Sequence, residues 1–257
     1  MATYTTEIAS DKIVSDNPIH QRLLQAYYLA MPYIKGDLLE LGCGEGRGVE
    51  LLSPLASSYM ALDKIDEVIQ SLKKQYPDVD FRQAVFPPFE GLADNSFDSI
   101  VSFQVIEHVK EDGDFLKEIH RVLKPGGVAV LTTPNIKKTL TRNPWHIREY
   151  TAPELTGLAS KYFDQVEMKG VGGNEKVWAY YEENKRSVEK ITRFDIFNLQ
   201  YRLPAALLRV PYDILNRMNR NKLNDANQGL VSDIKYSDYL LAEKAEEALD
   251  LFLVLRK

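Results

Sequence analysis

The sequence DLLELGCGEGRG, residues 37–48, decides the fold of this chain. Its first five residues are mostly apolar and predict a short buried strand. Glycine then occupies every second position from 42 to 48, and residues 49–56 continue with a helical pattern. Because a glycine-rich turn between a strand and a helix lets the backbone approach a ligand closely, this stretch predicts a ligand-binding α/β unit.

Strand-like and helical segments alternate along the chain after this unit. Further strands are predicted at residues 59–62, 79–84, 97–103, 128–133, 166–171 and 250–256. Helices are predicted at residues 65–75, 113–123 and 151–162, and a Thr-x-x-Glu capping box opens the last of them. This alternation predicts an α/β fold, a Rossmann-like and mostly parallel sheet with helices on both faces. Such a sheet binds its ligand beyond the carboxyl ends of its strands.

The composition limits the class of protein. The chain has 257 residues, of which 44% are hydrophobic and 27% charged, and this suits a globular protein with a full core. A single cysteine, Cys43, excludes a disulfide framework and a multi-cysteine metal site. The polar N-terminus is unlike a signal peptide and no apolar run reaches the roughly 20 residues of a membrane span, so we expect a cytoplasmic location. The net charge of −5 argues against general nucleic-acid binding.

The charge is distributed unevenly. Residues 185–222 carry nine Lys or Arg and three acidic residues, a net of +6, which leaves −11 for the rest of the chain. We expect a single domain over residues 1–257, with an N-terminal helical lid at 1–35 and a helical insertion at 175–235 before the final strand. Pro204 and Pro211 should break this insertion into short helices.

The role of the insertion has several interpretations. The favoured one is a cap that packs on its own domain and exposes its arginines. The alternatives are a lid over an anionic or hydrophobic substrate, a dimer contact, and a peripheral contact with an anionic membrane. Because the arginines are interspersed with apolar positions, the membrane contact is not favoured, and no oligomeric state is predicted.

The glycine loop narrows the class of ligand. A dinucleotide fingerprint needs glycine at 42, 44 and 47, but position 47 is arginine. A P-loop is excluded because no Gly-Lys-Ser/Thr follows. Glu40, just before the loop, suits a cofactor with an amino group better than a pyrophosphate. Asp63 ends the second predicted strand, where doubly wound folds place the carboxylate that accepts hydrogen bonds from ribose hydroxyls.

Five stretches, taken in order, resemble the motif series of class I S-adenosylmethionine-dependent methyltransferases. They are LLELGCGEGRG, ALD, NSFDSIVSFQVIEHV, RVLKPGG and LTTPN. The resemblance covers about residues 20–171 and resumes in the final strand. It implies a methyltransferase enzyme that uses S-adenosyl-L-methionine and releases S-adenosyl-L-homocysteine. It also implies a seven-stranded sheet whose last strand is antiparallel and inserted between its neighbours.

The resemblance further implies, by position, which residues hold the cofactor. The glycine loop passes under the methionine part, Glu40 faces the amino group and Asp63 holds the ribose diol. The residues after the second and third strands contact the adenine, and those after the fourth border the sulfonium. The implied set is Glu40, Gly42, Cys43, Gly44, Asp63, Lys64, Ile65, Gln83, Ala84, Phe103 and Gln104. Gln83 stands where many relatives have aspartate, and its amide oxygen can accept the same hydrogen bond.

Transfer of a methyl group to oxygen needs an aligned acceptor and a base or metal that takes its proton. The segment QVIEH, residues 104–108, resembles the metal-binding Glu-x-x-Glu-His of ubiquinone-biosynthesis O-methyltransferases and small-RNA 2′-O-methyltransferases, with Gln104 in place of the first glutamate. The resemblance implies Glu107, His108 and His146 as catalytic candidates. Three interpretations stay open. In the first, the Glu-His pair only shapes the pocket; in the second, a histidine acts as a base without a metal; in the third, the three residues bind a divalent metal.

Other residues have plainer expected roles. His120 is expected to pack or to face solvent. Cys43 is expected to serve through its small size and not as a nucleophile. His20, with Tyr27 and Tyr28, is expected to cap the mouth of the cofactor site, and core packing of the two tyrosines is the alternative.

The segment NPWHIREYTAPEL, residues 143–155, resembles that of bacterial methyltransferases of surface-polysaccharide and quinone pathways. We therefore expect methyl transfer to a small-molecule or glycan-type acceptor, at oxygen. The alternatives are an RNA 2′-O-methyltransferase with a metal site and a protein that binds S-adenosylmethionine without catalysis.

Overall fold

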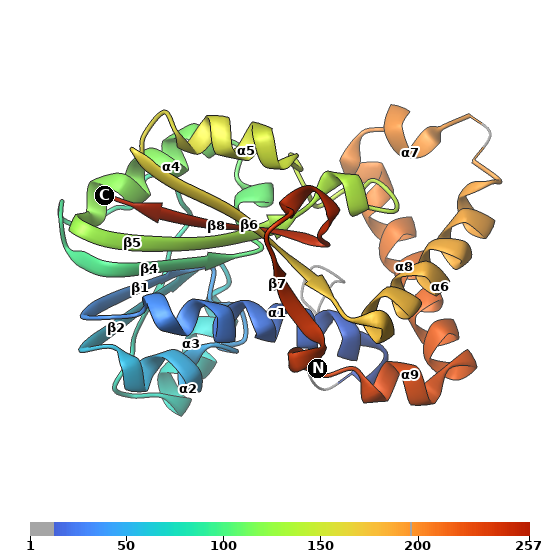
Figure 1. Ribbon diagram of the computed structural model, residues 1–257, viewed down its shortest axis with the longest axis horizontal. Helices are drawn as coiled ribbons and strands as arrows, with labels where there is room; N and C mark the ends of the chain where they lie inside the picture. Colours follow the sequence, from blue (N-terminus) through green and yellow to red (C-terminus); the bar gives the residue numbers. More distant parts are fainter. Residues whose placement is uncertain (1–12, 196) are drawn as a thin grey trace.

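The computed structural model of the protein describes residues 13–195 and 197–257. Residues 1–12, the start of the expected N-terminal lid, lie outside the described residues. The described strands form one sheet in the order β3-β2-β1-β4-β5-β8-β6-β7 (Figure 1). In chain order their bounds are β1 (Asp37–Leu41), β2 (Ser58–Asp63), β3 (Asp80–Gln83), β4 (Phe97–Phe103), β5 (Leu123–Pro134), β6 (Gln165–Gly173), β7 (Tyr239–Ala242) and β8 (Asp250–Arg256).

The strands β1 to β5 pair in parallel, as the alternation of strands and helices predicts. The last strand, β8, runs antiparallel between β5 and β6, and this confirms the expected insertion of the final strand. The expected number of seven strands is wrong, because the described residues contain eight. The additional strand is β7, which pairs with β6 at the edge of the sheet. Its four residues are too few, and its two middle ones too exposed, for a pattern to reveal it.

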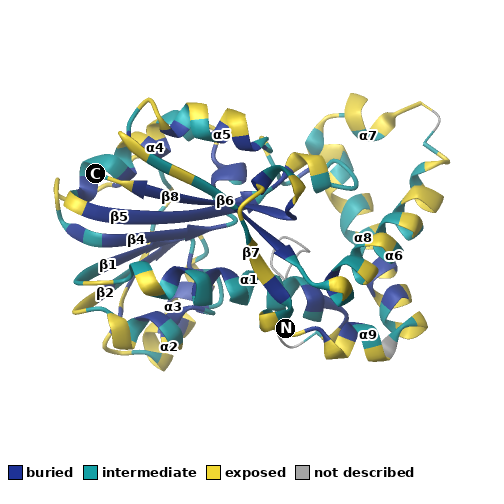
Figure 2. Ribbon diagram, in the orientation of Figure 1, coloured by how far each residue is buried: buried dark blue, intermediate teal, exposed yellow. Residues whose placement is uncertain are grey.

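Two layers of helices cover the sheet (Figures 1 and 2). Helices α1 (Asn17–Ala30), α2 (Val49–Leu52) and α3 (Asp66–Gln75) pack on one face, where their apolar residues join those of the strands in one core cluster. Helices α4 (Asp112–Val122) and α5 (Ala152–Ala159) cover the other face with a second cluster. The helix expected at 49–56 ends early, and a 3-10 turn that contains Pro54 follows. The predicted capping box at Thr151 is confirmed.

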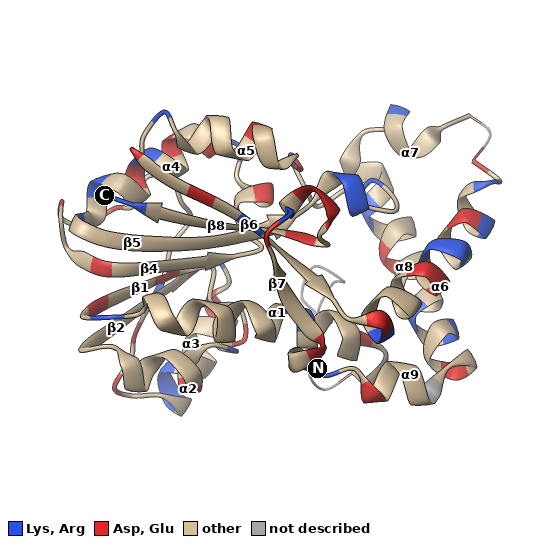
Figure 3. Ribbon diagram, in the orientation of Figure 1, with Lys and Arg blue, Asp and Glu red and all other residues tan. Residues whose placement is uncertain are grey.

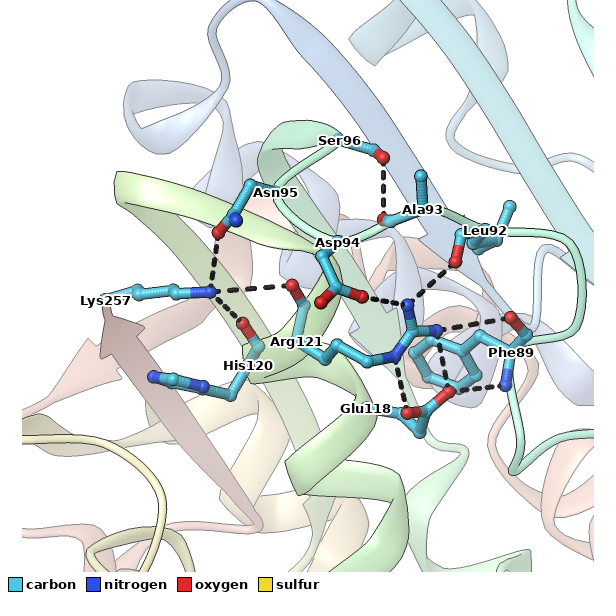
Figure 4. Close-up of polar contacts among 10 residues, drawn as sticks. All are labelled: Phe89, Leu92, Ala93, Asp94, Asn95, Ser96, Glu118, His120, Arg121 and Lys257. Carbon is cyan, nitrogen blue, oxygen red and sulfur yellow. Dashed lines mark hydrogen bonds and ion pairs between the residues drawn. The ribbon is translucent and has the colours of Figure 1, made fainter.

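A polar cluster fixes α4 to the turn that leads into β4 (Figure 4). The Arg121 guanidinium donates to the Asp94 carboxylate at 2.7 Å. The Lys257 ammonium donates to the backbone oxygen of His120 at 2.7 Å, and so joins the end of β8 to the end of α4. The His120 ring meets the edge of the Phe163 ring with centroids 5.2 Å apart. This histidine therefore packs within the fold, at the amino edge of the sheet and away from the loops after β1 and β4.

Four helices lie between β6 and β7, within the range that the sequence assigns to an insertion. They are α6 (Glu175–Thr192), α7 (Leu199–Arg202), α8 (Ala205–Ala226) and α9 (Gln228–Asp233). Pro204 separates α7 from α8 as expected, but Pro211 lies inside α8, so the predicted break there is wrong. Proline removes the bond to the carbonyl of Leu207, and both residues are exposed, so water can bind that carbonyl instead.

Buried charges attach α8 to the segment before α1. The Asp16 carboxylate is fully buried and accepts from the guanidinium of Arg217 at 2.7 Å and from that of Arg220 at 2.9 Å. Because a buried carboxylate without its cations would be strongly unfavourable, this cluster holds α8 against the N-terminal part of the fold. None of the helices in the described part of the chain is long and apolar enough to cross a membrane.

Candidate active site at the carboxyl edge of the sheet

The chain reverses direction across the sheet between β1 and β4, and the glycine loop lies at this point. The backbone N–H of Gly42 donates to the carbonyl of Leu62 at 2.8 Å, so the loop is bound to the neighbouring strand β2. Gly42 has φ +80°, and a Cβ there would lie 2.3 Å from Val105. Only glycine therefore fits between the ends of β1 and β4, and the close approach explains the first glycine of the motif.

Asp63 holds the loop in shape from the end of β2. One carboxylate oxygen accepts from the backbone N–H of Gly44 at 2.8 Å, and the other accepts from that of Ile65 at 3.0 Å. Gly44 has φ +50°, and a Cβ there would meet nothing within 4 Å, so the loop borders open space at this residue. Since each carboxylate oxygen has a second lone pair, Asp63 can also accept from a ligand.

This open space is a cavity of about 230 Å³, which we call the first cavity. It lies between the glycine loop, the ends of β2 and β4, and α1. Nine of the predicted cofactor residues line it, together with residues that the sequence did not indicate, among them Arg47, Phe86, Val105 and Val109. The predicted residues are Gly42, Cys43, Gly44, Asp63, Lys64, Ile65, Ala84, Phe103 and Gln104.

Two of the predicted residues lie elsewhere. Glu40 is buried beneath the loop and is absent from the lining of the first cavity. One of its oxygens accepts from the hydroxyl of Tyr27 at 2.7 Å and the other from that of Tyr59. Burial raises the pKa of Glu40. Gln83 is exposed, and its amide donates to the backbone oxygen of Lys64 at 3.3 Å. Glu40 thus holds two tyrosines in place beneath the loop, a role that no sequence pattern predicted.

His20, Tyr27 and Tyr28, which were expected to cap the mouth of the cofactor site, have different contacts. Tyr27 is buried and its ring meets that of Phe103 edge to face with centroids 4.7 Å apart, and it also lines the first cavity, so it both packs in the core and borders the site. Tyr28 stacks on Tyr236 with centroids 4.1 Å apart, outside the first cavity. His20 accepts from the Arg47 guanidinium at 3.3 Å.

Burial raises the pKa of the Cys43 thiol well above its usual range, with the neighbouring Glu40 and Asp63 charges adding to the effect. The thiol therefore stays protonated, which suits a small packing residue and not a nucleophile.

A second cavity of about 280 Å³ adjoins the first. It lies between the carboxyl edge of the sheet, α1, and the helices α6 and α8 of the insertion. The two cavities share Leu23, Gln104 and His108 in their linings, so these three residues form the junction. Gln104 has φ +57°, a left-handed conformation that is uncommon for a residue other than glycine. Its amide donates to the hydroxyl of Thr132 at 3.3 Å, which fixes the side chain at the junction.

The three catalytic candidates come together at this junction. One ligand atom from each of Glu107, His108 and His146 lies within 4.8 Å of the others. The carboxylate of Glu107 is buried and accepts from the Thr133 hydroxyl at 2.9 Å, while its other oxygen has no hydrogen-bond partner among the described residues. Burial raises the pKa of Glu107 to about 7.

The two histidines differ in what their nitrogens contact. Nδ1 of His146 lies 2.6 Å from the Glu149 carboxylate, and Nε2 lies 2.8 Å from the amide nitrogen of Asn143. The Asn143 oxygen accepts from a backbone N–H, which fixes the amide orientation, so both nitrogens of His146 are engaged. Nδ1 of His108 lies 2.9 Å from the Trp145 carbonyl and must carry a proton, because a carbonyl only accepts. The neutral ring of His108 then has its basic lone pair on Nε2.

Amides and phenols are numerous in the polar lining of the second cavity, beside charged side chains such as Arg22, Lys138 and Arg220. The amides are Gln104, Asn143, Asn184, Asn216 and Asn219, and the phenols are Tyr180, Tyr181, Tyr212 and Tyr239. The Asn219 amide donates to the Asn184 oxygen at 2.7 Å, and its own buried oxygen has no hydrogen-bond partner in the described part of the chain. Burial raises the pKa of Tyr212 to about 12, so this phenol stays protonated and can donate. Composition marked the insertion as distinct and Asn143 begins the segment 143–155 that the sequence singled out, but no motif pointed to the other residues.

Comparison with known proteins agrees with this arrangement. Residues 39–131 match the family described as methyltransferase domain. A probable S-adenosylmethionine-dependent methyltransferase of Mycolicibacterium smegmatis is 40% identical over 127 residues, which cover 48% of this chain and 49% of that protein. The ubiquinone biosynthesis O-methyltransferase of Caulobacter vibrioides is 31% identical over 108 residues, 40% of this chain and 43% of that protein. The chain thus spans about half the length of the curated relatives it matches.

A solved structure extends the likeness in fold to nearly the whole chain. It is an S-adenosylmethionine-dependent methyltransferase of Thermotoga maritima, described as a possible histamine N-methyltransferase. The TM-score is 0.58 with 16% identity, and the match covers 95% of this chain and 91% of that one. At this identity the likeness concerns the fold alone.

Proposed function

Because residues 39–131 form a methyltransferase domain of the class I S-adenosylmethionine-dependent type, we propose that this chain methylates an acceptor held in the second cavity, with S-adenosylmethionine held in the first. The observation that carries the proposal is the junction of the two cavities at Leu23, Gln104 and His108. Methyl transfer requires the donor and acceptor to meet in line, and adjoining cavities provide that alignment.

The residues of the first cavity fit this cofactor. Asp63 can accept from the ribose hydroxyls while it holds the backbone of Gly44 and Ile65. The open space at Gly44 leaves room for the methionine part beside the loop. Ala84 and Phe86 offer apolar contact to an adenine ring. When bound, the cofactor supplies an electrophilic methyl carbon on a sulfonium.

We assign the proton transfer to His108. Its Nδ1 is committed to the Trp145 carbonyl, so Nε2 is the atom that takes the hydroxyl proton of the acceptor. His146 has a positioning role, since Glu149 and Asn143 engage both of its nitrogens. Gln104 orders the junction through its bond to Thr132.

The lining of the second cavity favours a small-molecule or glycan-type acceptor that is methylated at oxygen. Amides and phenols donate and accept hydrogen bonds without charge, which suits a ligand with several hydroxyl groups. The ubiquinone O-methyltransferase relatives lend support to an oxygen acceptor.

A divalent metal at Glu107, His108 and His146 is the second candidate mechanism. The buried Glu107 oxygen without a partner favours it, because a cation would satisfy that atom. The engagement of both His146 nitrogens opposes it, since one hydrogen bond must break before the ring can bind an ion. An RNA 2′-O-methyltransferase would depend on this metal.

An acceptor panel tests the proposal. Release of S-adenosylhomocysteine is measured with methyl glycosides, with simple phenols and with RNA ends, each in the presence of EDTA and of added Mg²⁺ or Mn²⁺. The proposal predicts turnover of a glycoside or phenol that EDTA does not abolish. Turnover of RNA ends that depends on the metal would support the rival enzyme. Cofactor binding without turnover of any acceptor would favour a non-catalytic protein.

A further inference from the structure

The exposed apolar side chains of this protein gather in the insertion. Seventeen large hydrophobic residues are exposed in the described part of the chain, and ten of them lie between residues 191 and 218. Figure 2 shows exposed segments along α6, α7 and α8, the part of the chain in which these ten residues lie. Isolated exposed hydrophobics are normal on a protein surface, but a concentration of this kind indicates an interaction site.

On α8 these side chains form a stripe along one side of the helix. Leu207, Val210, Ile214 and Met218 are spaced by three or four residues and are 64%, 68%, 55% and 62% exposed. We call these four residues the outer stripe. The opposite side of α8 provides the packing and cavity residues Tyr212, Asn216, Asn219, Arg220 and Leu223. The favoured expectation from the sequence was a cap whose exposed side chains are arginines. In the structure, α8 also exposes the apolar outer stripe, which the rest of the described chain does not cover.

Aromatic residues are also exposed in the segment around α7, which precedes α8 in the chain. Phe194, Phe197 and Tyr201 are 76%, 64% and 63% exposed. The insertion therefore exposes both aliphatic and aromatic side chains, the composition of segments that lie in the interface of a bilayer.

Positive charge surrounds the apolar residues. Figure 3 shows Lys and Arg on α6 and α7, and residues 185–222 have a net charge of +6. Lys190, Arg202 and Lys222 are exposed and form no ion pair with the described residues. Since these three cations have no acidic partner among the described residues, this surface attracts an anionic partner.

An apolar surface of this kind could bind a second copy of the chain or a lipid bilayer, and its charge favours one of these over the other. A second copy bound through the same surface would bring two basic regions together, and their repulsion opposes that contact. The headgroups of an anionic bilayer instead complement the lysines and arginines while its acyl region accepts the apolar side chains.

We propose that the outer stripe of α8 and the aromatic segment around α7 dock the protein on an anionic lipid surface. The helix then lies in the plane of the interface with its outer stripe in the acyl boundary. Tyr212 and Asn216, on the other side of α8, line the second cavity, so this cavity lies within about 10 Å, one helix diameter, of the lipid. The proposal does not depend on the methyl-transfer reaction.

Cosedimentation of the full chain with vesicles tests the proposal. Vesicles of phosphatidylcholine alone are compared with equal parts of phosphatidylcholine and phosphatidylglycerol, at low and high salt. We expect binding to the mixed vesicles only, weakened by salt. The double variant Val210→Asp and Ile214→Asp should lower the partition by about tenfold or more, because two apolar side chains no longer enter the lipid.

Two further double variants test whether misfolding, and not loss of the apolar contact, explains weaker vesicle binding by the stripe variant. The matched control Leu55→Asp and Leu240→Asp changes two exposed leucines outside the insertion and should bind as the parent does. Arg202→Gln with Lys222→Gln keeps the apolar stripe and should lose most of the salt-sensitive binding. Absence of binding to the anionic vesicles would overturn the proposal, and so would equal binding by the stripe variant and its control. A dimer in sedimentation velocity that the stripe variant abolishes would assign the surface to a second copy and also overturn it.

Discussion

Asp63→Asn is the substitution that examines the first cavity most closely. The carboxylate accepts from two backbone N–H groups, at 2.8 Å from Gly44 and 3.0 Å from Ile65. Asparagine has the same shape but a single acceptor oxygen, so its NH₂ group must face one of these two donors. The loop then loses one hydrogen bond to a charged group, and a ligand loses the charge that its hydroxyls would contact.

The size of the effect follows from these contacts. A hydrogen bond to a charged group contributes about 1.5–3 kcal/mol, which corresponds to a loss of affinity of about 10- to 150-fold. Isothermal titration calorimetry with S-adenosylmethionine measures it. The control is Asp66→Asn, an exposed position at the start of α3 outside the lining of the first cavity. Equal affinity in the parent, Asp63→Asn and Asp66→Asn would refute the placement of the cofactor beside this carboxylate.

Three further substitutions have defined expectations. Tyr59→Phe leaves the buried Glu40 carboxylate without one donor and should cost about 1–3 kcal/mol, seen as a lower melting temperature, whereas the exposed Tyr201→Phe should leave it unchanged. His108→Asn keeps a donor for the Trp145 carbonyl but removes the base, so kcat should fall by about 10²–10⁴-fold while cofactor affinity is kept. Lys124→Gln removes the cation that lowers the pKa of two aspartates, so it should destabilise the protein at neutral pH in urea unfolding, and the difference from the parent should shrink as the pH falls below about 4.

The sign of the last expectation follows from the direction of the shifts. Hydrogen bonds from Lys124 hold the pKa of Asp37 and of Asp98 below its usual range. A carboxyl whose pKa is lower in the folded state stabilises that state above its unfolded pKa, and this contribution is lost as it becomes protonated. A stability difference that stays constant from neutral to acid pH would contradict the assignment.

The mostly parallel sheet and the position of the first cavity could be predicted because local signals mark them, whereas the inserted antiparallel last strand was implied by the resemblance to a family. The glycines of the loop and the acid at the end of β2 have fixed places in a doubly wound sheet, and the described structure has Gly42, Gly44 and Asp63 at one cavity. The short edge strand β7 could not be predicted, since four partly exposed residues carry no pattern. Pro211 gave the opposite error. Proline is a strong signal for a helix break, but α8 continues through Pro211 because that side of the helix is exposed.

The second cavity could not be predicted because its residues come from segments far apart in the chain. Asn143 follows β5, Tyr180 lies on α6 and Tyr212 on α8, and each alone is an ordinary polar or aromatic residue. The role of Glu40 was also hidden. The position of Glu40 just before the loop suggested that it contacts a ligand. Its carboxylate instead accepts hydrogen bonds from Tyr27 and Tyr59, which are distant in sequence, so only the folded structure reveals these contacts.

We propose above that the cofactor and the acceptor occupy two cavities that meet at Gln104 and His108. The most direct measurement is transfer of an isotope-labelled methyl group from S-adenosylmethionine to an accepted glycoside or phenol, by the parent and by Asn216→Trp, which fills the second cavity from α8. We expect the parent to place the label on the acceptor oxygen, whereas the variant should lose transfer and keep its affinity for S-adenosylmethionine. Undiminished transfer by the variant, or loss of cofactor binding together with transfer, would contradict the assignment of the two cavities.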